Sequence, residues 1–149
     1  MRVFRKDADY ATRCLIYLAM QGGSDYVSTT TLSEELGLPR NFLKCICTML
    51  IKAKILETRE GVRGGVRLAK KPDAINLLEL IELFDNKPEL NDCTIRKKPC
   101  PNRNTCLLRK RILGIEDRVS RDFAAITIQT LIDDLRQSEF QHDHVLFSM

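Results

Sequence analysis

The chain has 149 residues, of which 44% are hydrophobic, and its formal net charge at neutral pH is +4. This length suits one domain, or a small domain with an appendage, that can bury a core without crosslinks, which excludes a small disulfide-stapled secreted scaffold. The N-terminal region carries charges of both signs, and no apolar run is long enough to span a membrane, so we expect neither a signal peptide nor a membrane anchor. We therefore expect a cytoplasmic, reducing setting, where clustered cysteines more often bind metal or sense redox state than form disulfides.

The first third of the chain predicts three helices. Residues 7–20 place apolar side chains at helical spacing. Ser28 or Thr29 can cap a short second helix that Gly37 terminates, and Pro39 opens a third helix. Two helices joined by a tight glycine-containing turn form a helix-turn-helix pattern.

The third predicted helix has two different faces. Its buried stripe is expected to consist of Leu43, Ile46, Cys47 and Leu50. The opposite face carries basic, amide and hydroxyl side chains, the types that contact bases and phosphates. The candidate DNA contacts on this face are Arg40, Asn41, Lys44 and Thr48, with Cys45 among them.

A basic hairpin follows this helix. Residues 55–59 and 66–68 predict two short strands with a glycine-rich turn between them. A basic hairpin directly after a recognition-type helix is typical of a wing, whose arginines reach phosphates or a minor groove. The candidate wing contacts are Arg59, Arg63 and Arg67. The alternative is a small module whose basic face is only solvated, but the coincidence of helix spacing, hairpin and residue types favours DNA binding.

The second half of the chain predicts an amphipathic helix from "INLLELIELF", then a cysteine-containing loop, then a long helix over 105–124. The apolar stripe of the long helix consists of Leu108, Ile112, Ile115, Val119 and Phe123. A small domain offers little surface to cover such a stripe, so we expect a second copy of the chain to cover it in a homodimer. Thr127 can cap a short last helix.

The expected fold is mainly α with a small β-hairpin wing: a winged helix-turn-helix domain plus a long dimerisation helix. We expect the domain to cover residues 1–86, the cysteine-rich loop 87–107, the dimerisation helices 105–136 and a polar tail 137–149.

Three of the six cysteines lie in the basic, proline-containing loop, at Cys93, Cys100 and Cys106. Their gaps are wider than the tight C-x₂₋₄-C pair of structural zinc sites. Wide gaps suit an iron–sulfur cluster, and the neighbouring Arg and Lys side chains would favour thiolates and offset the charge of an anionic cluster. The spacing alone favours a cluster and leaves zinc and free thiols as alternatives.

Three thiolates leave one cluster position without a cysteine. Cys14 and Cys47 fall on predicted core stripes, Cys45 lies on the predicted DNA face, and His142 and His144 lie in the tail. An oxygen ligand is therefore the better candidate, from the set Asp7, Asp9 and Glu116.

Several stretches resemble the Rrf-two superfamily of bacterial winged-helix regulators over about residues 1–136. They are "DYATRCLIYLA" (9–19), "RNFL" (40–43), "REGVRGGVRLAKKPDAINLLELIELFD" (59–85) and the three-cysteine loop. The resemblance implies a homodimer with the helix 105–124 at its interface. It also implies a cluster, [2Fe–2S] or [4Fe–4S], held on each protomer by the loop cysteines, which by position are Cys93, Cys100 and Cys106.

The resemblance also bears on the fourth ligand. IscR-like members have a histidine three residues after the last cysteine, where this chain has Arg109. NsrR-like members can instead use an aspartate from an Asp-Tyr pair in the first helix of the partner subunit, and that position is Asp9, before Tyr10. The resulting prediction is a dimeric transcription repressor on a near-palindromic DNA operator that senses nitric oxide, redox or iron status through its cluster.

Two other hypotheses stay open at this point. The first is a zinc-binding or thiol-redox-sensing transcription regulator. The second is a protein-interaction module that regulates a metabolic enzyme through its basic face without DNA. An enzyme is not expected, because the sequence shows no Ser-His-Asp or paired-acid arrangement and both histidines lie in the tail.

Overall fold

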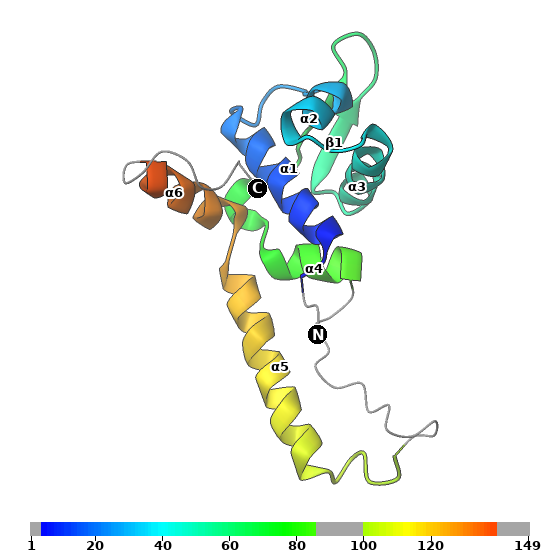
Figure 1. The fold of residues 1–149 in the computed structure, drawn as a ribbon, viewed down its shortest axis with the longest axis vertical. Helices are drawn as coiled ribbons and strands as arrows, with labels where there is room; N and C mark the ends of the chain where they lie inside the picture. Colours follow the sequence, from blue (N-terminus) through cyan, green and yellow to red (C-terminus); the bar gives the residue numbers. More distant parts are fainter. Residues whose placement is uncertain (1–3, 86–99, 140–149) are drawn as a thin grey trace.

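The computed structural model describes residues 4–85 and 100–139, so Cys93, His142 and His144 lie outside the described residues. The elements in chain order are α1 (Lys6–Met20), α2 (Thr29–Leu36), α3 (Arg40–Lys52), β1 (Leu56–Arg59), β2 (Gly65–Leu68), the 3₁₀ helix η1 (Pro72–Ala74), α4 (Leu77–Asp85), α5 (Leu107–Ala125) and α6 (Ile128–Glu139). Figure 1 shows α1 to α4 and the hairpin in one body, from which α5 projects. The expected fold class, helical with a small hairpin, is confirmed.

The helix-turn-helix forms for the local reasons that the sequence suggests. The Ser28 hydroxyl accepts a hydrogen bond from the Thr31 N–H at 3.0 Å, which caps α2. Gly37 ends α2 in the left-handed conformation, with φ of 62°, where a residue without Cβ carries no steric penalty. The chain then turns at Pro39 into α3.

The core lies where the predicted stripes of α1, α3 and α4 meet. The four stripe residues of α3 expose at most 3% of their surface, and Cys14 and Leu15 of α1 expose none. From α4, Leu80 is fully buried and Phe84 is partly buried. One hydrophobic cluster thus fixes α3 so that its polar side faces outward.

The hairpin is tied to the segment before α2. β1 and β2 pair antiparallel from Leu56 opposite Leu68 to Arg59 opposite Gly65, within one residue of the predicted strands. Val27 adds a bridge to Val66, in which each N–H donates to the other residue's carbonyl at 2.9 Å. The segment before α2 therefore holds the hairpin on the body.

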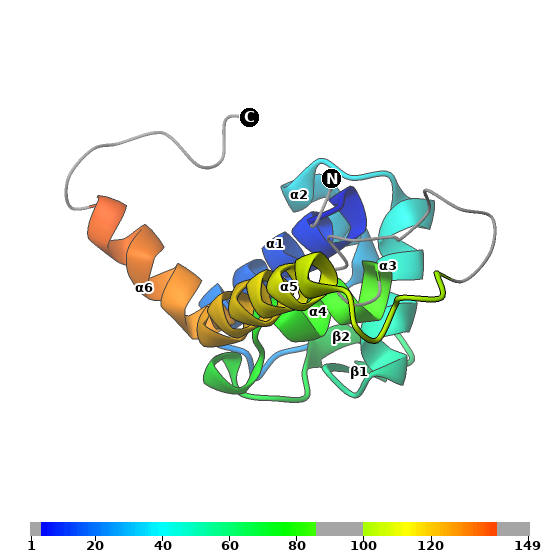
Figure 2. The ribbon, with the colours of Figure 1, turned by 90° about the horizontal axis from the view of Figure 1, so that it is seen from below.

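The α5 helix has no buried residue in the described protomer, as the predicted need for a covering partner implies. Leu107 and Leu108 at its start expose 78% and 69% of their surface. The α6 helix contacts α1 and η1 and buries Ile128 and Ile132, and Figure 2 shows its far end extending away from α1. The Thr127 hydroxyl caps α6 as predicted, accepting from the Thr130 N–H at 3.1 Å. Among the described helices, none combines the length and apolar character needed to cross a bilayer.

Candidate nucleic-acid interface and cysteine site

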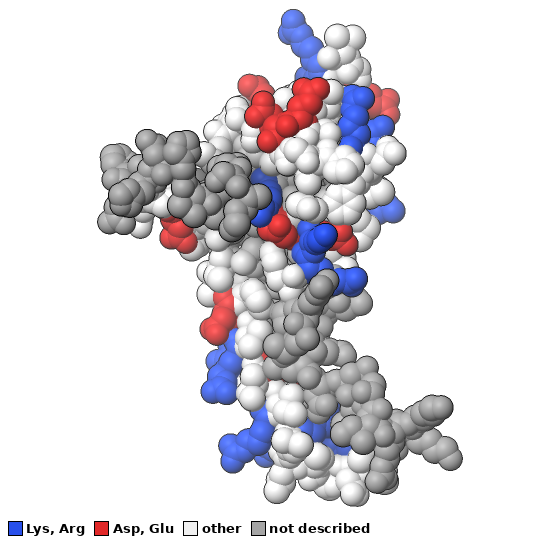
Figure 3. Space-filling model, in the orientation of Figure 1, with Lys and Arg blue, Asp and Glu red and all other residues white. Residues whose placement is uncertain are grey.

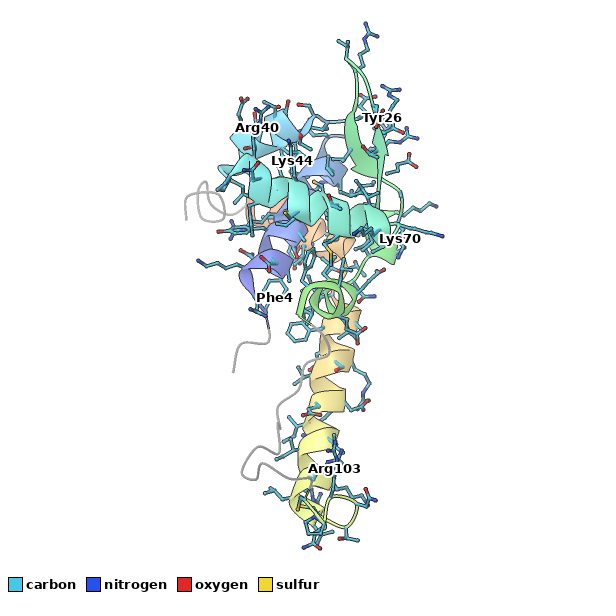
Figure 4. All side chains as sticks on the ribbon, turned by 90° about the vertical axis from the view of Figure 1, so that its right-hand side faces the viewer. Phe4, Tyr26, Arg40, Lys44, Lys70 and Arg103 are labelled. Atoms are coloured by element: carbon cyan, nitrogen blue, oxygen red, sulfur yellow. The ribbon has the colours of Figure 1, made fainter. Side chains whose placement is uncertain are left out.

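The outward side of α3 is a continuous polar strip. Its exposed side chains are those predicted for this face: Arg40, Asn41, Lys44, Cys45 and Thr48. Figure 4 labels Arg40 and Lys44 on α3. The Thr48 hydroxyl donates to the Lys44 carbonyl at 2.8 Å, so its oxygen remains able to accept a hydrogen bond. The Arg40 guanidinium donates to the Thr30 hydroxyl, which links the start of α3 to α2.

The three predicted wing arginines occupy different environments. Arg63 is exposed, and its side chain has no partner within the part of the chain that the structure describes. Arg59 stacks on Tyr26 with its Cζ 4.4 Å from the ring centroid, and its Nη2 donates to the Arg63 carbonyl at 2.7 Å. Arg67 also lies over Tyr26, forms an ion pair with Glu57 and is half-buried.

Basic side chains gather on one edge of the molecule. Figure 3 shows them at the tip of the hairpin and along the edge where α3 lies, with a few acidic side chains between them and an acidic group over α2. Arg67 donates a hydrogen bond to the Glu57 carboxylate, and this bond raises the pKa of the Arg67 guanidinium. A basic strip of this kind suits a phosphate backbone, and the amide and hydroxyl groups within it suit base edges.

The described loop cysteines lie at the start of α5. Cys106 is the N-cap residue, and its Sγ accepts a hydrogen bond from the Arg109 N–H at 3.4 Å. Cys100 is partly exposed, and its carbonyl accepts from the Arg103 N–H at 3.1 Å. The sulfur of Cys106 thus faces a backbone N–H donor at a helix N-terminus, and these surroundings fit a ligand to an anionic iron–sulfur cluster. Within residues 4–85 and 100–139, no three ligand-type side chains come together, since the third predicted thiol, Cys93, lies outside this part.

The predicted oxygen ligand, Asp9, lies in the first turn of α1 and forms an ion pair with Arg13 at 3.2 Å. Its side chain is 39% exposed and can therefore be approached from outside. Figure 1 shows α1 within the body and the start of α5 at the far end of the projecting helix. Asp9 is thus not brought to Cys106 within one protomer.

The other cysteines lie where the sequence predicts. Cys45 is exposed, whereas Cys14 and Cys47 are buried between α1 and α3. A hydrogen bond with Cys47, together with burial, raises the pKa of the Cys14 thiol well above its usual range. The same hydrogen bond lowers the pKa of the Cys47 thiol. Both thiols are core side chains, and Cys14, which is fully buried and has the raised pKa, is the less reactive of the two.

Sequence reasoning missed Tyr26 and Glu57. Tyr26 contacts two arginines of the hairpin, and Glu57 pairs with one of them. The position of Glu57 could have been found from the strand register, because Glu57 lies opposite Arg67. No local pattern points to Tyr26, since its contacts come from the packing of the hairpin.

Comparison with known proteins gives consistent matches along most of the chain. Residues 4–134 match the family described as "Rrf2: Iron-dependent Transcriptional regulator". The HTH-type transcriptional regulator NsrR of Shouchella clausii is 30% identical over 133 residues, which cover 88% of this chain and 86% of that protein. The structure of T. potens IscR has a TM-score of 0.69 at 18% identity, covering 95% of this chain and 92% of its own. The structure of CymR, the global cysteine regulator of B. subtilis, has a TM-score of 0.67 at 20% identity, covering 87% of this chain and 95% of its own.

Proposed function

The chain belongs to the Rrf2 family of transcriptional regulators, the Rrf-two superfamily of the sequence resemblance, and we propose that it is a homodimeric repressor with an iron–sulfur sensor. Its relatives are transcription regulators rather than enzymes, and the family membership argues against the interaction module without DNA. The observation that carries the proposal is the polar strip of α3, which lies opposite a fully packed core stripe and beside a basic hairpin.

In the proposed complex, each protomer places α3 in a major groove. Arg40 and Asn41, at the start of α3, read base edges, while Lys44 and Thr48 lie about one and two turns further along and contact phosphates or bases. Arg63, at the exposed end of the hairpin, contacts a phosphate or the minor groove. Because a dimer presents two copies of α3, the operator is near-palindromic with half-sites about one helical turn, or a multiple, apart.

We assign the sensor to Cys93, Cys100 and Cys106 of one protomer and Asp9 of the other. When bound, the cluster would supply iron that reacts with nitric oxide or oxygen. Cys106 is the N-cap residue of α5, and α5 contacts α4 of the winged domain. A displacement of Cys106 would therefore move α5 relative to the domain that carries α3. Such coupling between two sites is the basis on which a signal could alter DNA affinity.

The cluster assignment is tested with protein purified without air. Absorption spectra and iron and sulfide content would be measured before and after adding nitric oxide. Cys100→Ala and Cys106→Ala are expected to abolish the visible colour, whereas Cys14→Ala and Cys45→Ala, the matched controls, are expected to keep it. A variant lacking all three loop cysteines that retained its full iron content would refute the assignment.

The cross-dimer ligand is tested by mixing chains. A heterodimer of an Asp9→Ala chain and a Cys100→Ala chain keeps one intact site if Asp9 serves the partner's cysteines, because both changes fall in the same other site. If the ligands all come from one chain, both sites of that heterodimer are damaged and no normal spectrum is expected. Asp7→Ala and Glu116→Ala serve as acidic controls and are expected to leave the spectrum unchanged.

DNA binding is tested by capturing genomic DNA on the purified protein at physiological salt and sequencing the bound fragments. We expect enrichment of near-palindromic sites. Absence of enriched sites would contradict DNA binding and favour the interaction module that acts without DNA.

A second candidate is a thiol-sensing transcription regulator that holds no metal. The exposed position of Cys45 within the polar strip of α3 favours it, since oxidation there would change the surface that faces DNA. The structural likeness to CymR shows the fold alone. Protein that lacks iron and zinc, and that loses DNA binding on peroxide treatment unless Cys45 is replaced by serine, would support this candidate over the cluster.

A further inference from the structure

We propose that Tyr26 is a positioning residue for the wing: its ring holds Arg59 and Arg67 and thereby fixes the loop that presents Arg63 to DNA. The proposal rests on the proposed DNA binding by the hairpin and divides the work among its arginines. It gives Arg63 the contact with DNA and gives Arg59 and Arg67 the task of shaping the wing.

The first step is the contact between the ring and both guanidinium groups. The Cζ atoms of Arg59 and Arg67 lie 4.4 Å and 4.5 Å from the centroid of the Tyr26 ring. Both distances are within the range in which an aromatic ring attracts a cation. Figure 4 shows Tyr26 beside the hairpin, and its neighbour Val27 bridges to Val66 of β2. The ring is therefore held at a set place against both strands.

The second step concerns Arg67, which two hydrogen bonds and the Tyr26 ring hold within the fold. It forms an ion pair with Glu57 on the facing strand, and its Nη1 donates to the Ser24 carbonyl at 3.0 Å. The Tyr26 hydroxyl donates to the same Glu57 carboxylate at 3.4 Å. To contact a phosphate, Arg67 would have to leave several partners at once, so its role is to join β2 to the segment before α2.

The third step concerns Arg59, which transmits the position of the ring to the loop. Its Nη2 donates to the Arg63 carbonyl at 2.7 Å, and the Gly64 N–H donates to the Gly61 carbonyl at 3.0 Å. Arg59 thus holds the Arg63 carbonyl, and the Gly61–Gly64 hydrogen bond closes the turn that contains Arg63. The Arg63 side chain remains exposed. Without the ring, the loop would sample more conformations, and only a fraction of the molecules would present Arg63 correctly. Apparent affinity falls by that fraction, and the number of phosphate contacts in the final complex does not change.

The decisive variants are Tyr26→Leu, which removes the ring, and Tyr26→Phe, which keeps the ring and loses only the hydroxyl. DNA affinity would be measured over a series of salt concentrations beside Arg63→Ala. We expect Tyr26→Leu to bind about fivefold more weakly at every salt concentration with an unchanged salt slope, and Tyr26→Phe to stay within about twofold of wild type. Arg63→Ala is expected to reduce the slope by about one.

A second measurement tests the contact between Tyr26 and the two arginines independently of the proposed function. It is hydrogen exchange of the backbone from Glu60 to Gly65 in the absence of DNA. We expect faster exchange in this segment for Tyr26→Leu and wild-type exchange for Tyr26→Phe. If the wild-type protein binds no DNA, the proposed function is wrong, but the exchange rates still show whether Tyr26 orders the loop. Unchanged exchange in Tyr26→Leu would overturn the proposal. A salt slope of DNA affinity reduced as in Arg63→Ala would also overturn it, because the stacked arginines would then be DNA contacts themselves. Should Tyr26→Leu not fold, Tyr26→Met, with a longer apolar side chain, carries the same expectations.

Discussion

Replacing Gly65 by alanine tests how the hairpin is attached to the body. Gly65 has φ of +151°, and a Cβ there would lie 2.2 Å from the Val27 carbonyl oxygen and 2.8 Å from the Ser28 nitrogen. Gly61 is the matched control, because its φ of +107° is also rarely adopted by L residues but nothing lies within 4 Å of its Cβ position. Gly61→Ala therefore carries only the backbone cost, about 1–3 kcal/mol.

Gly65→Ala adds the loss of the bridge between Val27 and Val66, because the new methyl group must push the two segments apart. That bridge consists of two hydrogen bonds of 2.9 Å, each worth about 1 kcal/mol. We thus expect Gly65→Ala to lower the free energy of unfolding by about 2 kcal/mol more than Gly61→Ala does, which corresponds to a melting temperature lower by about 6 °C.

The measurement is urea denaturation of both variants and wild type, followed by far-ultraviolet circular dichroism. The unfolding slopes should agree, so that the midpoints report stability alone. If Gly65→Ala is no less stable than Gly61→Ala, the bridge does not hold the hairpin and the reasoning is refuted. If the reasoning holds, Gly65→Ala should also weaken DNA binding, since the displaced hairpin no longer presents Arg63 beside α3.

Three further outcomes follow from the proposed sites. Asn41→Ala is expected to reduce discrimination between the operator and a scrambled sequence by about 1–3 kcal/mol, whereas Arg63→Ala should weaken binding to both; fluorescence anisotropy would measure this, and equal loss of discrimination would reverse the two roles. Alkylation of the native protein, followed by mass spectrometry, should modify Cys45 rapidly and spare Cys14, whose pKa is raised by its hydrogen bond with Cys47 and by burial; equal rates would show that the core opens. Asp9→Ala should make the bound cluster decay faster in air, and an unchanged decay rate would remove Asp9 as a ligand.

The two faces of α3 were predictable from the sequence because one physical condition determines them. A helix packed on a core must place its apolar residues at helical spacing, and Leu43, Ile46, Cys47 and Leu50 follow this rule. The remaining positions are then exposed by geometry. Ser28 and Gly37 were predictable for a similarly local reason, since a cap and a left-handed turn depend on single residues.

The wing arginines could not be told apart from the sequence. Their residue type and their place in a hairpin are alike, yet Arg63 is exposed while Arg67 is held by Glu57 and Tyr26. The difference comes from the strand register and from the packing of the hairpin against the segment before α2. Such contacts join residues more than 30 positions apart, as in the hydrogen bond between Tyr26 and Glu57, and no local pattern encodes them.

The apolar stripe of α5 is largely uncovered in the described part of one protomer. Leu107 and Leu108 remain largely exposed in one protomer, although the stripe to which Leu108 belongs is apolar along the whole helix. Exposed apolar surface of this extent is unfavourable in water, and the second copy of the chain that we propose would cover it. The proposed dimer would cover the apolar stripe of α5, and it would also bring Asp9 of one protomer to Cys106 of the other.

Asp9 also explains how a site of this kind could be reactive. Its carboxylate is shared with Arg13 at 3.2 Å, and both side chains are about two-fifths exposed, with values of 39% and 43%. An exposed ion pair of this type contributes about 0–1 kcal/mol to stability. The Asp9 carboxylate therefore needs little free energy to leave Arg13 for another partner, or to leave that partner and pair with Arg13 again. In the proposed dimer, Asp9 is therefore a ligand with a competing cation, Arg13, one helical turn away, whereas the sulfur of Cys106 faces the Arg109 N–H at the start of α5. The iron facing Asp9 would be the position from which a small molecule could displace a ligand most easily, and α1, which carries Asp9, contacts α3 directly.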